Sequence, residues 1–170
     1  MLNSKKNHYL CSALQMANNM KTRALLVILL MAICFIVKAA DGTTTYNGTL
    51  SDIQMNDKTF PALTGKTFTL TLSSADKGVI DGEVGRIGKM PGTLHFTIPV
   101  TLAPDGTLKA AKGIEAGKMT MNIGLTRKLV TEDFTGSVRD GQLHFVLHIT
   151  SSMLGITMAD ATLTFDGESK

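Results

Sequence analysis

Apolar and polar residues alternate strictly in five stretches of this chain, each five to nine residues long. In the longest stretch, Leu94, Phe96, Ile98 and Val100 alternate with histidine, threonine and proline. Because successive side chains of a β-strand point to opposite faces, this pattern predicts strands with one buried face. The five stretches are residues 66–73, 94–102, 118–125, 143–149 and 161–165.

Weaker alternation predicts further strands, and turn signals separate them. Asp105-Gly106 and Asp140-Gly141 are dipeptides that suit the positive φ angles of tight hairpins. The weaker strands are expected at residues 45–54, 78–87, 106–115 and 130–138. Residues 151–155 are expected to form a turn or a short helical piece. The mature chain therefore reads as eight or nine short strands joined by short loops.

Sequential strands with short connections predict an antiparallel meander. Such a sheet exposes unpaired edges unless it closes on itself. We therefore expect an all-β fold, an eight-stranded antiparallel up-and-down barrel. A two-sheet β-sandwich is the alternative, because it produces the same alternation.

The N-terminal region has the pattern of an export signal. Lys21 and Arg23 precede an apolar run of 14 residues, Ala24–Val37, and small residues follow it. This run is shorter than the roughly 20 residues of a membrane-spanning helix. The pattern predicts a secretory signal peptide that is cleaved after Ala39, with Ala40 as the alternative.

This prediction divides the chain into three parts. Residues 1–19 look like an over-extended start with no role in the fold, residues 20–39 form the signal peptide, and residues 40–170 form a single domain. We expect the protein to be exported to the periplasm or to the extracellular side of the cell surface. After processing we expect no transmembrane anchor.

The mature domain is mildly acidic. Twelve of the 17 basic residues and all 14 acidic residues follow Ala39, so its expected net charge is −2. This balance argues against nucleic acid as a partner and against electrostatic attraction to acidic membranes. Both cysteines, Cys11 and Cys34, precede the predicted cleavage site, so we expect neither a disulfide nor a thiolate metal site.

Several stretches of the chain resemble the calycin-like β-barrel domain family, small secreted proteins of anaerobic Gram-negative bacteria. The similar stretches are Tyr46–Leu50, Gly85–Gly88, Gln142–Met158 and Ala161–Gly167. Together they make the resemblance extend over essentially the whole mature chain. The resemblance implies a lipocalin-like barrel and an extracytoplasmic location. It implies no established chemistry, because a fold does not determine a function.

Histidines recur in the two similar stretches GTLHFTIPV and GQLHFVLHI. His95, His144 and His148 each lie on the polar face of a predicted strand. His144 and His148 are four residues apart, about 13 Å along a strand. One metal ion with ligand distances of about 2.1 Å cannot bind both. We therefore expect outward-facing histidines, no metal site and no cofactor.

The remaining candidate site is the barrel interior. The sequence has no nucleophile elbow and no distinctive pair of carboxylates, so we expect no enzymatic activity. The predicted function is binding of a lipid or other apolar small molecule inside the barrel. The alternative is an envelope or surface interaction module with a filled core. The inward-facing residues expected to contact a ligand are Phe68, Leu70, Phe96, Ile98, Met119, Met121, Phe145 and Leu147.

Overall fold

The computed structural model describes residues 42–90, 92–153 and 156–170, which belong to one compact unit, Ala40–Lys170. These residues form ten β-strands and no helix. The strands are β1 (Gly42–Met55), β2 (Lys58–Phe60), β3 (Leu63–Leu72), β4 (Lys77–Gly85), β5 (Gly92–Leu102), β6 (Thr107–Lys109), β7 (Glu115–Met121), β8 (Thr126–Arg139), β9 (Gln142–Met153) and β10 (Ile156–Ser169). The predicted signal peptide, residues 20–39, and the predicted over-extended start, residues 1–19, lie outside the described residues.

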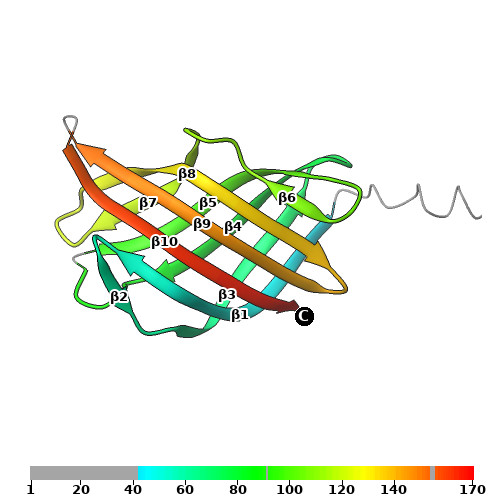
Figure 1. The fold of residues 1–170 in the computed structure, drawn as a ribbon, viewed down its shortest axis with the longest axis horizontal. Coiled ribbons are helices and arrows are strands. Elements are labelled where there is room, and N and C mark those ends of the chain that lie inside the picture. Colours follow the sequence, from blue (N-terminus) through cyan, green and yellow to red (C-terminus); the bar gives the residue numbers. More distant parts are fainter. Residues whose placement is uncertain (1–41, 91, 154–155) are drawn as a thin grey trace, which may run out of the picture. The chain divides into compact units, whose positions relative to one another are not determined.

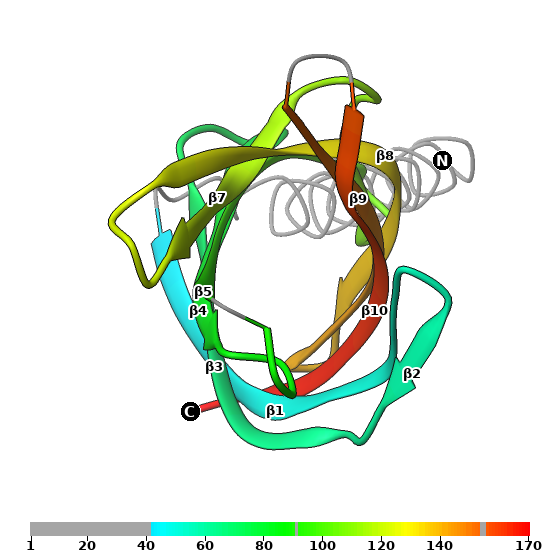
Figure 2. The same cartoon turned by 90° about the vertical axis from the view of Figure 1, so that its left-hand side faces the viewer.

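Eight of the described strands close into an antiparallel barrel (Figure 1, Figure 2). From β1 through β3, β4, β5, β7, β8 and β9 to β10, each pairs with the next, and β10 pairs back with β1. The short strands β2 and β6 lie outside this ring, paired with β1 and with β5 and β8. The prediction of an up-and-down barrel is confirmed, and the sandwich alternative is wrong because β10 closes the ring on β1.

Alternation along the strands places the apolar face inside the barrel. In β5, Leu94, Phe96, Ile98 and Val100 are buried, and the residues between them are exposed. The hairpin between β8 and β9 also forms as its Asp-Gly dipeptide predicts. Asp140 and Gly141 have φ angles of 51° and 76°, the positive values that a two-residue hairpin turn requires.

Two predicted strands are shorter than expected because glycines turn the chain. The strand expected at 118–125 ends at Met121, and the chain turns at Gly124, where φ is 79°. Its last two apolar residues, Ile123 and Leu125, are therefore 75% and 45% exposed instead of facing the interior. The strand expected at 106–115 is limited to β6, and Gly113 turns the chain after it with φ of 81°.

The expected turn at residues 151–155 is also wrong in part. Ser151 and Ser152 continue β9, which pairs with β10 as far as Met153↔Ile156. Residues 154 and 155 lie outside the described residues. The expected strand at 78–87 ends at Gly85, and the sequence reasoning did not foresee β2.

Four fully buried phenylalanines pack together inside the barrel, and we name them the phenylalanine cluster: Phe68, Phe96, Phe145 and Phe165. The ring centroid of Phe68 lies 6.3 Å from that of Phe96, 5.3 Å from Phe145 and 4.7 Å from Phe165. Gly82 on β4 makes room for this ring, because a Cβ at Gly82 would lie 2.7 Å from Cε1 of Phe68. The barrel interior is therefore filled by side chains at the level of this cluster.

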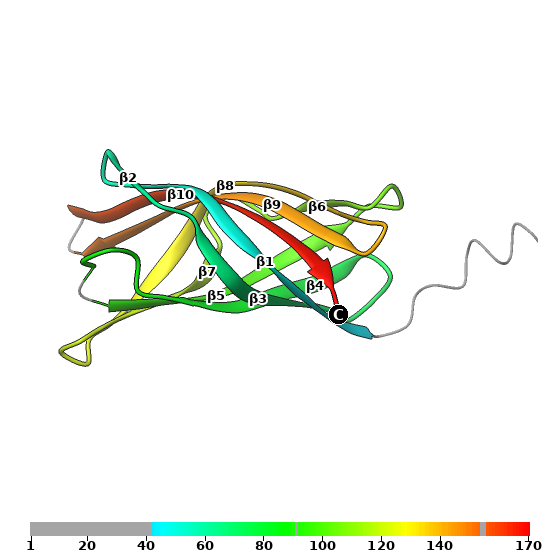
Figure 3. The ribbon, with the colours of Figure 1, turned by 90° about the horizontal axis from the view of Figure 1, so that it is seen from below.

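The two ends of the barrel differ. At the end that faces the viewer in Figure 2, the described part of the β4–β5 loop (residues 86–90), the β7–β8 turn (residues 122–125), the β1–β2 turn (residues 56–57) and the start of β10 lie around the opening. Figure 3 shows β2 and the β7–β8 turn at this same end, on the left. We name it the mouth end, because the cavity described below lies there.

Candidate functional site

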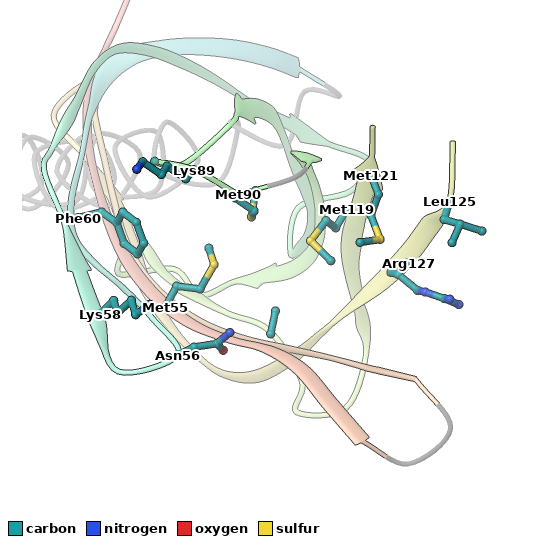
Figure 4. Close-up of a pocket in the computed structure, with 12 residues that line it drawn as sticks. Met55, Asn56, Lys58, Phe60, Lys89, Met90, Met119, Met121, Leu125 and Arg127 are labelled. Carbon is teal, nitrogen blue, oxygen red and sulfur yellow. The ribbon is translucent and has the colours of Figure 1, made fainter. Parts of the chain in front are cut away.

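A cavity of about 700 Å³ lies at the mouth end of the barrel (Figure 4). Its walls come from segments far apart in the sequence: the ends of β1, β2 and β7, the starts of β8 and β10, and the β4–β5 loop. Ligand sites for small molecules have volumes of about 300–1,000 Å³, so the cavity has the size of such a site.

Four methionines supply much of the apolar wall: Met55, Met90, Met119 and Met121. Met55 and Met119 are buried, and Met90 and Met121 are half-buried. Figure 4 shows Met119 and Met121 on the opposite side of the cavity from Met55. Methionine side chains are unbranched and polarisable, so they adapt to apolar ligands of different shape.

One side of the mouth is held in place by a contact between β2 and the β4–β5 loop. The ring of Phe60 lies against Gly88, where an added Cβ would be 2.6 Å from Cε1 of Phe60. Gly88 also has a φ of 55°, in the left-handed region that favours glycine. A side chain at position 88 would therefore push Phe60 away and open this side of the cavity.

The rim of the cavity is basic. Lys58, Lys89 and Arg127 line it, and none of the described lining residues is acidic. Lys58 and Lys89 are exposed, and neither forms an ion pair with any residue that the structure describes. The side-chain oxygen of Asn56 accepts a hydrogen bond of 2.9 Å from the amide of Asp160, which ties the β1–β2 turn to β10.

The structure separates the eight predicted ligand-contact residues into two groups. Met119 and Met121 line the mouth cavity. The other six do not line it and lie in the buried core: Phe68, Leu70, Phe96, Ile98, Phe145 and Leu147. Sequence reasoning missed the rim because its residues come from three separate segments, namely β2, the β4–β5 loop and β8. The basic residues at 58 and 89 were visible in the sequence, but nothing there showed that they line the same cavity.

The three histidines lie on the outer face, as predicted, and each pairs with an aspartate of a neighbouring strand. His95 Nε2 lies 3.2 Å from Asp81 Oδ2. On β9, His144 Nδ1 lies 2.7 Å from Asp166 Oδ1, and His148 Nε2 lies 2.7 Å from an oxygen of Asp160. No group of three or more potential metal ligands occurs within the described ranges.

Three carboxylates away from the cavity have lowered pKa values, each because of a specific partner. A hydrogen bond from Lys128 lowers the pKa of Glu115, and a hydrogen bond from Lys112 lowers that of Glu132. The pKa of Asp105 is lowered first by the amide of Thr107, which donates to its carboxylate over 3.0 Å. All three groups are therefore more readily ionised than ordinary carboxyls.

Two hydroxyl groups inside the barrel are buried without a hydrogen-bond partner among the described residues. They belong to Thr131 on β8 and Ser151 on β9, which are at most 1% exposed. Ser151 pairs with Ala159, a residue of the cavity wall, so its hydroxyl is buried close to the mouth.

A second hollow of about 600 Å³ lies on the outside of the barrel, and we name it the outer groove. Its lining includes the outward-facing Val79 and Pro99 and the loop residues Ala110 and Ile114. Lys77 and Lys109 also line it. The outer groove thus combines apolar residues and lysines at the end of the barrel away from the mouth.

No family model, protein of established function or solved structure matches the chain in the comparisons made. Within the described residues there is no helix of the length and hydropathy that crossing a membrane requires.

Proposed function

We propose that the protein is an exported, non-enzymatic β-barrel that binds a lipid or another apolar small molecule in the mouth cavity. One observation carries the proposal: a cavity of about 700 Å³ whose walls include four methionines and Phe60. Export rests on the signal-peptide pattern of residues 20–39. We include membership of the calycin-like family in the proposal, because a closed eight-stranded barrel is the fold that the resemblance implies.

Binding of an apolar ligand is favourable because it removes the apolar cavity wall and the ligand surface from water. Burial of apolar surface contributes roughly 25 cal/mol per Å². The mouth offers a concave wall, and the phenylalanine cluster limits how far a ligand can enter. A bound ligand would therefore contact the methionines of the mouth rather than extend through the whole barrel.

The test compares two alanine substitutions that add the same bulk at different sites. Ala159→Phe fills the mouth cavity, and Ala110→Phe fills the outer groove as its matched control. Native mass spectrometry of each protein from its own host should show a bound small molecule in the wild type and in the control, but not in Ala159→Phe.

A second variant and a second measurement are included because Ala159→Phe could lose binding by misfolding. Met121→Glu places a charge in the half-buried wall and should also abolish binding. Melting temperatures measured with a panel of lipids should rise for the wild type and the control only. An empty wild-type protein whose melting temperature no lipid raises would refute the proposal.

The exposed β7–β8 turn favours a second candidate function, an envelope or surface interaction module. Ile123 is 75% exposed and Leu125 45%, so the turn presents two nearby apolar side chains to solvent, and exposed apolar patches mark interaction sites on proteins. Crosslinking in the envelope, followed by purification, should capture one specific partner with the wild type and lose it with Ile123→Ser. Capture of the same partner by both proteins would refute this candidate.

A further inference from the structure

We propose that the mouth cavity selects a single-chain amphiphile with an anionic head group, and that Lys58 and Lys89 bind this head group. This inference rests on the proposed function and specifies its ligand class. The apolar chain would lie against the methionines, and the head group would stay at the rim.

The two lysines lie on the same side of the mouth. Lys58 is on β2, two residues before Phe60, and Lys89 directly follows Gly88. Because Phe60 packs on Gly88, both lysines lie on the side of the mouth where β2 contacts the β4–β5 loop. Figure 4 shows Lys58, Phe60 and Lys89 together on one side of the cavity.

The charges at this rim have one sign. The mature domain has an expected net charge of −2, yet the described lining of the cavity has three basic residues and no acidic one. Asp57, the exposed neighbour of Lys58, is not part of the lining. An anion at the rim therefore meets attraction from both lysines.

The position of the lysines beside an apolar wall gives the charge a role in selection. An apolar chain that enters the cavity removes water near the rim, and desolvation of a charged group is costly unless an opposite charge replaces the water. An anionic head group replaces it, a neutral head group does so only in part, and a cationic head group adds repulsion. The cavity should therefore rank ligands by the charge of their head group.

The inference is tested with three probes that share one chain: dodecanoate, dodecanol and dodecylammonium. Isothermal titration calorimetry at low ionic strength should show dodecanoate binding about fivefold more tightly than dodecanol, since each exposed ion pair contributes little. Dodecylammonium should bind most weakly. The preference for dodecanoate should shrink as salt is added, because salt screens exposed charges.

The double variant Lys58→Gln/Lys89→Gln should reduce the preference for dodecanoate over dodecanol to less than twofold. The matched control is Lys77→Gln/Lys109→Gln, which removes the same charge from exposed lysines at the outer groove. This control should keep the full preference. Loss of the preference for dodecanoate in this control would overturn the inference, because the head group would then bind near the outer groove and not at the mouth.

The outcomes separate the inference from the proposed function. If dodecanoate and dodecanol bind wild-type protein equally well, the inference is wrong and the proposed function stands. If none of the three probes binds, the inference is wrong, whereas the proposed function is refuted only if the wild-type protein from its host is also empty and no lipid raises its melting temperature. Tight binding of dodecanoate that disappears with Ala159→Phe and weakens in the lysine double variant supports both.

Discussion

The contact between Gly82 and Phe68 provides a quantitative test of how the barrel core is packed. The two residues face each other across β4 and β3, and Phe68 is fully buried in the phenylalanine cluster. Replacement of Gly82 by alanine would place a Cβ 2.7 Å from Cε1 and 2.8 Å from Cγ of the ring. These distances are too short for carbon atoms, so the ring has to move.

The magnitude follows from two opposing effects. Overpacking of a core costs about 1–3 kcal/mol. Alanine is favoured over glycine in a strand by about 0.5–1 kcal/mol, and Gly82 is not among the residues with positive φ. Gly82→Ala should therefore lower the free energy of unfolding by about 1–2 kcal/mol. After Phe68→Ala removes the ring, the same substitution should stabilise by about 0.5–1 kcal/mol.

The double-mutant cycle should thus give a coupling energy of about 2 kcal/mol. Phe68→Ala by itself should cost about 3–5 kcal/mol. The assay is urea-induced unfolding followed by far-ultraviolet circular dichroism. The control cycle pairs Gly82→Ala with Phe134→Ala on β8, whose ring contacts that of Phe145 at 5.9 Å. Additivity within about 0.5 kcal/mol in the Gly82–Phe68 cycle would show that the proposed contact does not limit packing.

Two further predictions concern stability. Thr131→Val removes a buried hydroxyl that has no partner among the described residues, so it should raise the melting temperature by about 4 °C. The exposed Thr135→Val is its control and should have no effect, and a lower melting temperature for Thr131→Val would contradict the reasoning. Glu132→Gln removes a carboxylate whose pKa is lowered mainly by Lys112. The pKa of Glu132 in the folded protein lies below the ordinary value of about 4.3, so the ionised group stabilises the fold above that pH. This stabilisation is lost as the pH falls through the folded pKa. The melting temperatures of wild type and Glu132→Gln should differ at neutral pH and converge in acid, and a difference that stays constant with pH would disprove this.

Sequence reasoning predicted the fold well because alternation is a local property. The inward faces of β3, β5 and β9 follow from period-two patterns that span a few residues each. The turn at Asp140-Gly141 was predictable for the same reason. Where local signals conflicted, prediction was less accurate: alternation favoured a strand as far as Leu125, but Gly124 ended it earlier.

The candidate site was harder to predict because its residues come from strand ends and loops far apart in the sequence, which the fold brings together. Met119 and Met121 were identified from their inward positions on β7. Lys58 and Lys89 line the same side of the cavity because Phe60 packs on Gly88, a contact between two segments with no shared local pattern. The same limitation applies to the histidines: their outward orientation is local, but the pairing of His148 with Asp160 depends on the register of β9 and β10.

The sequence by itself determined most of the strands, the hairpin turn at Asp140-Gly141 and the buried face of the strands with strict alternation. These features depend on side-chain direction and backbone angles over a few neighbouring residues. Only the tertiary structure decided that β10 closes on β1, that phenylalanines fill part of the interior, and that a methionine-lined cavity remains at one end. The physical reason is that closure, packing and cavity volume depend on how distant segments fit together in space.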